Sequence, residues 1–247
     1  MLWEFSIFFL TLVYLGILWI AYSYPASLFW PGAFFLLILL VSIRTISRRY
    51  IFFVFPALLA IGTVLLLPLI DSPAQAKAFL ALSIGVFYFS VLGAHRLGRY
   101  KEDQTAKAML NLAAFSVLFC WFSAGYGWYL NVQMPVWIIM VTFALITFPI
   151  SYILLVINEL NLDKYQRILY SIFLSYLIAG AIWMQNFWPF GYLTTGVITL
   201  IIYYSGWDII RSYFLEKLAF QRIVFNILFL AGTASLLLLS TKWYPAI

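Results

Sequence analysis

The chain has 247 residues, of which 66% are hydrophobic, 21% are aromatic and only 9% are charged. An average soluble domain is about 25% charged, so this composition excludes a protein surrounded by water and indicates a lipid environment. The net charge of +6 comes from basic residues spread over separate short gaps. Because no basic tract or polar domain exists, we expect no nucleic-acid partner. The single cysteine, Cys120, excludes an intrachain disulfide.

Nine apolar runs follow one another, each about as long as a helix needs to be to cross a bilayer. They predict an all-α, polytopic helical membrane bundle that forms one integral membrane domain over residues 1–247. Beta structure is disfavoured because the runs are continuous rather than alternating. The first run lacks a basic start and is long, so we expect a helix rather than a signal peptide. In chain order the runs cover residues 3–23, 28–46, 50–70, 76–94, 108–127, 136–157, 168–187, 192–210 and 223–240.

Twelve of the fourteen Lys and Arg residues fall in alternate gaps between these runs. The other gaps hold only Lys77, and the C-terminal tail holds only Lys242. Basic loops stay on the cytoplasmic side during insertion, so the pattern predicts a cytoplasmic N-terminus and an external C-terminus. We expect the bacterial cytoplasmic membrane. The basic gaps contain Arg44, Arg48 and Arg49, then Arg96, Arg99, Lys101 and Lys107, then Lys164 and Arg167, then Arg211, Lys217 and Arg222.

The predicted outer side is rich in tryptophan and has short, turn-like gaps, such as the gap from Gln185 through Pro189. An aromatic belt at headgroup level is one interpretation. A belt alone would populate both interfaces, however, so an outward aromatic groove for a lipid tail or glycan is the alternative. The eight outer tryptophans are Trp19, Trp30, Trp121, Trp128, Trp137, Trp183, Trp188 and Trp243.

Two segments resemble one another beyond their hydropathy. One contains Lys164, Gln166 and Arg167, and the other contains Lys217, Gln221 and Arg222. Each follows an outer-side proline, so the pattern predicts a parallel repeat in which the hairpin Pro135–Gly180 superposes on Pro189–Gly232. The alternative interpretation is that both are interfacial helix ends with snorkelling cations and local charge pairs.

The polar residues offer little chemistry inside the predicted spans. Asp208 is the one acid arguably within a span, so ion coupling by mid-membrane acids is excluded. An ion-driven transporter would have to use backbone carbonyls and hydroxyls such as those of Thr194, Thr195 and Thr199. His95 is the only histidine, which excludes bis-histidine haem ligation. With no recognisable catalytic motif, we expect no catalytic residues, no metal and no cofactor.

Asp208 has two interpretations. With Arg211 three residues later it can form a structural pair on one helix face. Alternatively, Asp208 and Arg211 join His95, Arg96 and Arg99 in an inner-face site for an anionic lipid headgroup.

Small residues predict tight helix contacts in two spans, because lipid-embedded helices associate by close packing. Pro56 and Pro149 are predicted to kink their spans. The small residues are Ala113, Ala114, Ser116, Ser123, Ala124, Gly125 and Gly127 in the fifth span, and Ala231, Gly232, Thr233, Ala234 and Ser235 in the ninth.

The leading hypothesis is therefore a non-enzymatic multi-pass membrane protein that serves as the membrane subunit of a larger assembly. Its expected partners are membrane lipids and either another membrane protein or further copies of itself. A transporter or lipid carrier built from repeated hairpins is the alternative. A lipid-modifying enzyme is disfavoured, since Asp208, Glu159 or Asp163 would have to converge with His95 or arginines.

Overall fold

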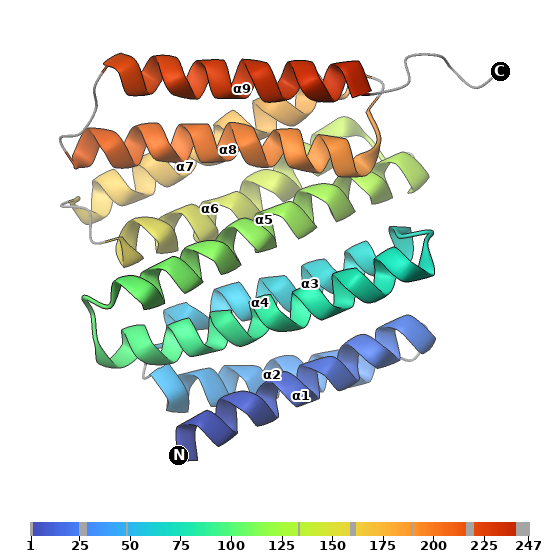
Figure 1. Cartoon of the computed structure of the whole chain (residues 1–247), viewed down its shortest axis with the longest axis vertical. Helices are drawn as coiled ribbons and strands as arrows, with labels where there is room; N and C mark the ends of the chain where they lie inside the picture. The colour runs from blue at the N-terminus through green and yellow to red at the C-terminus, as the bar shows by residue number, and fades with distance from the viewer. Residues whose placement is uncertain are drawn as a thin grey trace. The chain divides into compact units, whose positions relative to one another are not determined.

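The computed structural model describes residues 2–24, 29–47, 49–132, 134–158, 162–188, 190–215 and 220–240, and all regular structure in these ranges is helical. A helix covers each of the nine predicted runs (Figure 1). The elements are α1 (Leu2–Ser23), α2 (Phe29–Ser47), η2 (Tyr50–Phe53), α3 (Val54–Leu66), η3 (Leu67–Leu69), α4 (Pro73–Arg99), α5 (Gln104–Val132), α6 (Val136–Ile157), α7 (Lys164–Gln185), α8 (Tyr192–Phe214) and α9 (Phe220–Ser240).

Eight of the described helical segments are long and apolar enough to cross a membrane. In α9 the apolar stretch with described side chains is shorter, Val224–Leu236. These lengths fit a membrane-embedded helical protein, because a helix rises about 1.5 Å per residue and a bilayer core is about 30 Å thick. Which side each loop faces stays a prediction.

The chain divides into two compact units, residues Met1–Cys120 and Trp121–Ile247, with the boundary inside α5. In the first unit α1, α2 and α3 each contact α4, and successive helices run in opposite directions (Figure 1). In the second unit α6 contacts α7, α7 contacts α8, and α8 contacts α9. The single integral membrane domain over residues 1–247 stays a prediction.

The core of the first unit is centred on Tyr14 of α1, which is fully buried. Its ring stacks on Phe87 of α4 with the centroids 4.1 Å apart. Its hydroxyl lies 2.7 Å from Thr63 Oγ1 of α3. The single hydroxyl proton of Thr63 is directed at the carbonyls of Leu59 and Ala60, so Tyr14 is the donor in this pair. One side chain thus joins three helices.

The second unit is held by close contacts along the second half of α5. A Cβ at Gly125 would press on the Phe143 ring of α6, and a Cβ at Gly196 of α8 would lie 3.0 Å from Ser123 Cα. Such spacing requires small residues at the crossing, as predicted for the fifth span. Ser151 of α6 and Tyr203 of α8, both buried, share a hydrogen bond of 3.1 Å.

The two intrahelical prolines differ in their surroundings. Pro149 lies inside α6, which continues through it. Pro56, predicted to kink the middle of a span, instead lies in the first turn of α3, directly after the 3₁₀ turn η2. Because proline has no N–H and crowds the carbonyl four residues earlier, it favours this tighter turn at the start of the span.

Candidate functional site

The end of α4 that is predicted to face the cytoplasm is tied to the end of α2. His95 Nδ1 lies 3.2 Å from the carbonyl oxygen of Ile46. One turn later Gly98 meets the backbone of Ser47, where an added Cβ would lie 2.9 Å from Ser47 Cα. The half-buried His95 thus caps the last turn of α2, which is a structural role.

Arg96 continues this network into the loop between α4 and α5. Its Nε donates to Asp103 Oδ2 at 2.7 Å, and the Ala106 backbone N–H donates to Asp103 Oδ1 at 3.0 Å. The Ala106 N–H first, and then the Arg96 guanidinium, lower the pKa of Asp103 below its ordinary value. Asp103 is therefore the N-terminal cap of α5 and also the anchor of Arg96. Arg99, at the end of α4, is exposed.

Asp208 of α8 is buried, and the partner described for it lies on the next helix. Asn226 of α9, also buried, donates its Nδ2–H to Asp208 Oδ2 at 3.0 Å. Sequence reasoning considered Arg211 as the partner and missed Asn226. Arg211 is half-buried on the same helix. A polar pair in an apolar interface fixes the rotation of one helix against the other.

The inner-face headgroup site combined residues of both units. His95, Arg96 and Arg99 belong to the first unit, whereas Asp208 and Arg211 belong to the second. Within the first unit, the three residues lie at one end of α4, where His95 contacts Ile46 and Arg96 contacts Asp103. The five-residue site stays a prediction.

The repeat motif has a local explanation in its first copy. Gln166 Oε1 accepts a hydrogen bond of 3.1 Å from the backbone N–H of Asp163, just before α7 begins. This is half of a capping box, in which the third residue of a helix reaches back to its cap. Lys164 is exposed and Arg167 is half-buried. In the second copy Gln221 is exposed at the start of α9, while Lys217 and the side chain of Arg222 lie outside the described residues.

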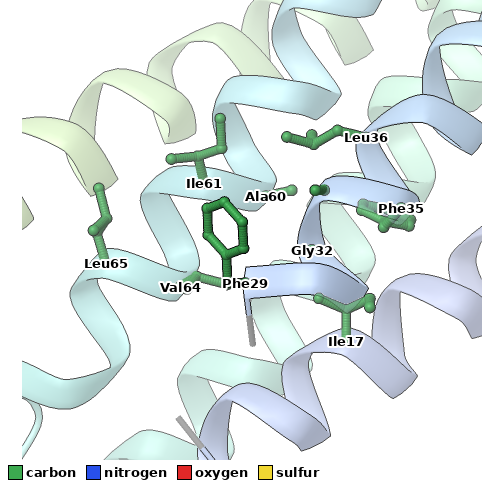
Figure 2. Close-up of a pocket in the computed structure, with 10 residues that line it drawn as sticks. Ile17, Phe29, Gly32, Phe35, Leu36, Ala60, Ile61, Val64 and Leu65 are labelled. Atoms are coloured by element: carbon green, nitrogen blue, oxygen red, sulfur yellow. The ribbon is translucent and has the colours of Figure 1, made fainter. Parts of the chain in front are cut away.

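An apolar cavity of about 520 Å³ lies between α1, α2 and α3 in the first unit (Figure 2). Figure 2 shows the Phe29 ring standing between Ile61 and Val64 of α3, with Ile17 of α1 below. Its lining side chains offer no hydrogen-bonding group, so hydrocarbon suits it and a glycan does not. The lining consists of Ile17, Phe29, Gly32, Ala33, Phe35, Leu36, Ala60, Ile61, Val64 and Leu65.

A buried polar cluster lies in the second unit at the other end of the helices from Asp208. Gln185, the last residue of α7, is 2% exposed, and Thr195 and Thr199 of α8 are fully buried. Thr199 Oγ1 lies 3.1 Å from the Gln185 amide and 2.7 Å from the Thr195 carbonyl oxygen. The other terminal atom of the Gln185 amide has no hydrogen-bond partner among the described residues.

Two residues of α5 border this cluster. Ser123 is fully buried against Gly196, the neighbour of Thr195, and its hydroxyl has no described hydrogen bond. Tyr126 approaches the Thr195 hydroxyl, although without the geometry of a full hydrogen bond. Neutral polar groups of α5, α7 and α8 are thus buried around the first two turns of α8.

Sequence reasoning named Thr195 and Thr199, and it counted Gln185 both in the run 168–187 and in the outer gap from Gln185 through Pro189. The structure places Gln185 in the helix. Gln185 is helical and buried because it continues the inward face of α7. The signal was in the spacing: steps of three and four residues are the repeat of a buried helix face. The buried positions on that face are Ser171, Ser175, Ile178, Ile182 and Gln185.

The long apolar helices, of which eight in the described ranges are long enough to cross a membrane, fit the class of helical membrane-embedded proteins. Residues 41–241 match the family described as "Protein of unknown function (DUF5656)", and the chain belongs to that family. The matched range begins within α2 and covers α3 to α9 completely. No curated protein and no solved structure matches the chain.

Proposed function

We propose that the chain is a non-enzymatic multi-pass membrane protein that serves as the membrane subunit of a larger assembly in the bacterial cytoplasmic membrane. The observation that supports this most is the contrast between two helices with predicted small-residue interfaces. On α5, Ser123, Ala124 and Gly127 are buried against neighbouring helices of the chain. On α9, Ala231, Gly232 and Ser235 are exposed.

The exposed face of α9 suits a protein partner. A Cβ at Gly232 would meet nothing within 4 Å. Asn226 is buried against Asp208 of α8, so the rotation of α9 is fixed and its small residues are held outward. Lipid tails gain little from a flat surface of small residues, whereas a second helix can approach it closely. We propose a transmembrane helix of a different subunit as the occupant.

Purification in mild detergent tests the subunit role. We expect a stoichiometric membrane protein to co-purify with the wild type and with Gly180→Leu, and to be lost with Gly232→Leu. Gly180 is the matched control because its Cβ position is equally open but lies on α7. A partner retained by Gly232→Leu, or a pure monomer that carries measurable flux, would contradict the proposal. Self-association lost with Gly232→Leu would make a second copy the occupant.

A carrier is the second candidate, and the buried cluster around Gln185 favours it. Polar groups in an apolar bundle are costly unless they are paired. One terminal atom of the Gln185 amide and the Ser123 hydroxyl have no partner within the described residues. In a chain without mid-membrane acids, neutral oxygens are the groups that an ion would use. Uptake of a monovalent cation into proteoliposomes tests this role.

A further inference from the structure

We propose that Gln185, Thr195 and Ser123 form a binding site for a monovalent cation, Na⁺ or K⁺, in the second unit. The proposal gives the carrier candidate a substrate class, and its test separates binding from transport. The first step is to decide which neighbour of the Thr199 hydroxyl receives its single proton.

A threonine hydroxyl has one proton and can donate one hydrogen bond of full strength. Thr199 Oγ1 lies 2.7 Å from the Thr195 carbonyl oxygen, which can only accept. The proton therefore belongs to that shorter contact. The Gln185 amide, 3.1 Å from the same hydroxyl, must then donate an N–H to it. With the amide nitrogen facing it, the Thr199 hydroxyl takes part in two hydrogen bonds. With the amide oxygen facing it, the hydroxyl takes part in only one.

The orientation decides which atom of Gln185 is left over. Amide nitrogen and oxygen are distinguished by their hydrogen bonds. In the structure, Gln185 Oε1 faces Thr199 and Nε2 has no described partner. Interchanging the two atoms, as the proton count requires, leaves the carbonyl oxygen without a described partner. A buried, unpaired acceptor costs about 1–3 kcal/mol, so an electropositive ligand at this position is favoured. The residue is 2% exposed, so bulk water does not supply that ligand freely.

Two further oxygens lie in the same region. Thr195 Oγ1 and Ser123 Oγ are buried without a described hydrogen bond of full geometry. Ser123 packs directly on Gly196, so α5 and α8 are as close here as their backbones permit. The site is thus built from one amide carbonyl and two hydroxyls on three different helices.

These ligands select the class of ion. Within the described ranges, no group of three or more His, Cys, Asp or Glu residues is placed to hold a metal ion. Calcium and magnesium sites normally include carboxylates. Neutral carbonyl and hydroxyl oxygens instead replace the hydration shell of a monovalent cation. The helix dipole favours a positive charge at the C-terminal end of α7 and disfavours one at the N-terminal start of α8. The oxygen ligands themselves must therefore provide the affinity for the cation.

Thermal unfolding of the purified full chain in detergent tests the site. The probes are LiCl, NaCl and KCl, compared with N-methylglucamine chloride at equal ionic strength. We expect NaCl or KCl to raise the Tm saturably, by about 5–10 °C at a concentration near 100 times Kd. Gln185→Met and Thr195→Val should lose this rise. Ser90→Ala should keep it, because Ser90 is a buried hydroxyl without a described partner in the first unit.

If neither NaCl nor KCl raises the Tm of the wild type specifically, the cation site is wrong and a buried water is the occupant. A rise that persists in Gln185→Met would overturn it as well. If both variants fail to fold, Gln185→Glu provides the test: the added charge should shift the rise to lower cation concentration, and an unchanged midpoint would contradict the proposal. Binding without uptake into proteoliposomes would refute the carrier role and leave the site intact.

Discussion

The two oxygens of the Asp103 carboxylate have different partners, Arg96 at the end of α4 and the Ala106 N–H at the start of α5. The side chain is 12% exposed, and that of Arg96 is 41% exposed. Each contact is charge-assisted, which makes it stronger than a bond between neutral groups. Asp103 thus connects the end of α4 to the start of α5 through both of its carboxylate oxygens.

The lowered pKa of Asp103 makes a prediction about acid stability. Its folded pKa lies below the unfolded value of about 4, so its contribution is complete above pH 4 and is lost as the pH falls through the folded pKa. Asp103→Asn should lower the Tm at pH 7, and the difference from the wild type should vanish below the folded pKa. Tm measured against pH checks this. Glu102→Gln, an exposed neighbour, should match the wild type at every pH, and a constant deficit for Asp103→Asn would contradict the account.

Asp208 and Asn226 make a second prediction at the residue scale. Asn226→Leu removes a donor from a buried carboxylate, so unfolding should cost about 1–3 kcal/mol less than in the wild type. Asp208→Asn keeps an oxygen that can accept from Asn226 and should cost less than that. Chemical denaturation in detergent measures both changes. Ile227→Leu, on an exposed position of α9, is the control and should be neutral within about 0.5 kcal/mol. Equal losses for Ile227→Leu and Asn226→Leu would contradict a specific role of the pair.

Helices are the scale at which the sequence was most informative. A run that avoids charges for about 20 residues has few alternatives to a helix in lipid, so each predicted run became one. The ends were less accurate, because α4, α5 and α7 begin before the predicted apolar runs, at Pro73, Gln104 and Lys164. Hydropathy stops at the first polar residue, whereas a helix continues until its caps are satisfied.

The polar cluster was only partly predictable. Thr195 and Thr199 were recognised because they are hydroxyls inside an apolar run. Gln185 was counted in the run 168–187 and also in the polar, tryptophan-rich gap that follows, and the face spacing of α7 indicates that it is buried. Asn226 gave no signal as a partner of Asp208, since which residues of α8 and α9 meet depends on the rotation of both helices.

Glycine substitutions test the packing of the helices. Gly98→Ala should destabilise the protein by about 1–3 kcal/mol, because the new Cβ meets the backbone of Ser47, which cannot move aside easily. Gly85→Ala, on the same helix and in open space, should stabilise by up to about 1 kcal/mol through helix propensity. Unfolding free energies of the two variants check the contrast. Equal effects would contradict the close contact between α2 and α4.

At the scale of the whole molecule, the charge pattern predicts a membrane topology, and the helix bounds are compatible with it. Each basic residue near an anionic leaflet contributes on the order of 1 kcal/mol of bias toward the cytoplasmic side. Twelve basic residues on one predicted side against two on the other therefore predict the orientation. The membrane-subunit role and the outward face of α9 both depend on this arrangement.

Site-directed cysteine labelling tests that topology most directly. The native Cys120 is buried in α5, so background labelling is low, and Cys120→Ala removes it completely. Met134→Cys and Asp163→Cys place exposed thiols at opposite ends of α6. In intact cells, a membrane-impermeant maleimide should label Met134→Cys and should label Asp163→Cys only after the membrane is permeabilised. Labelling of both positions from the same side would contradict the nine-span arrangement.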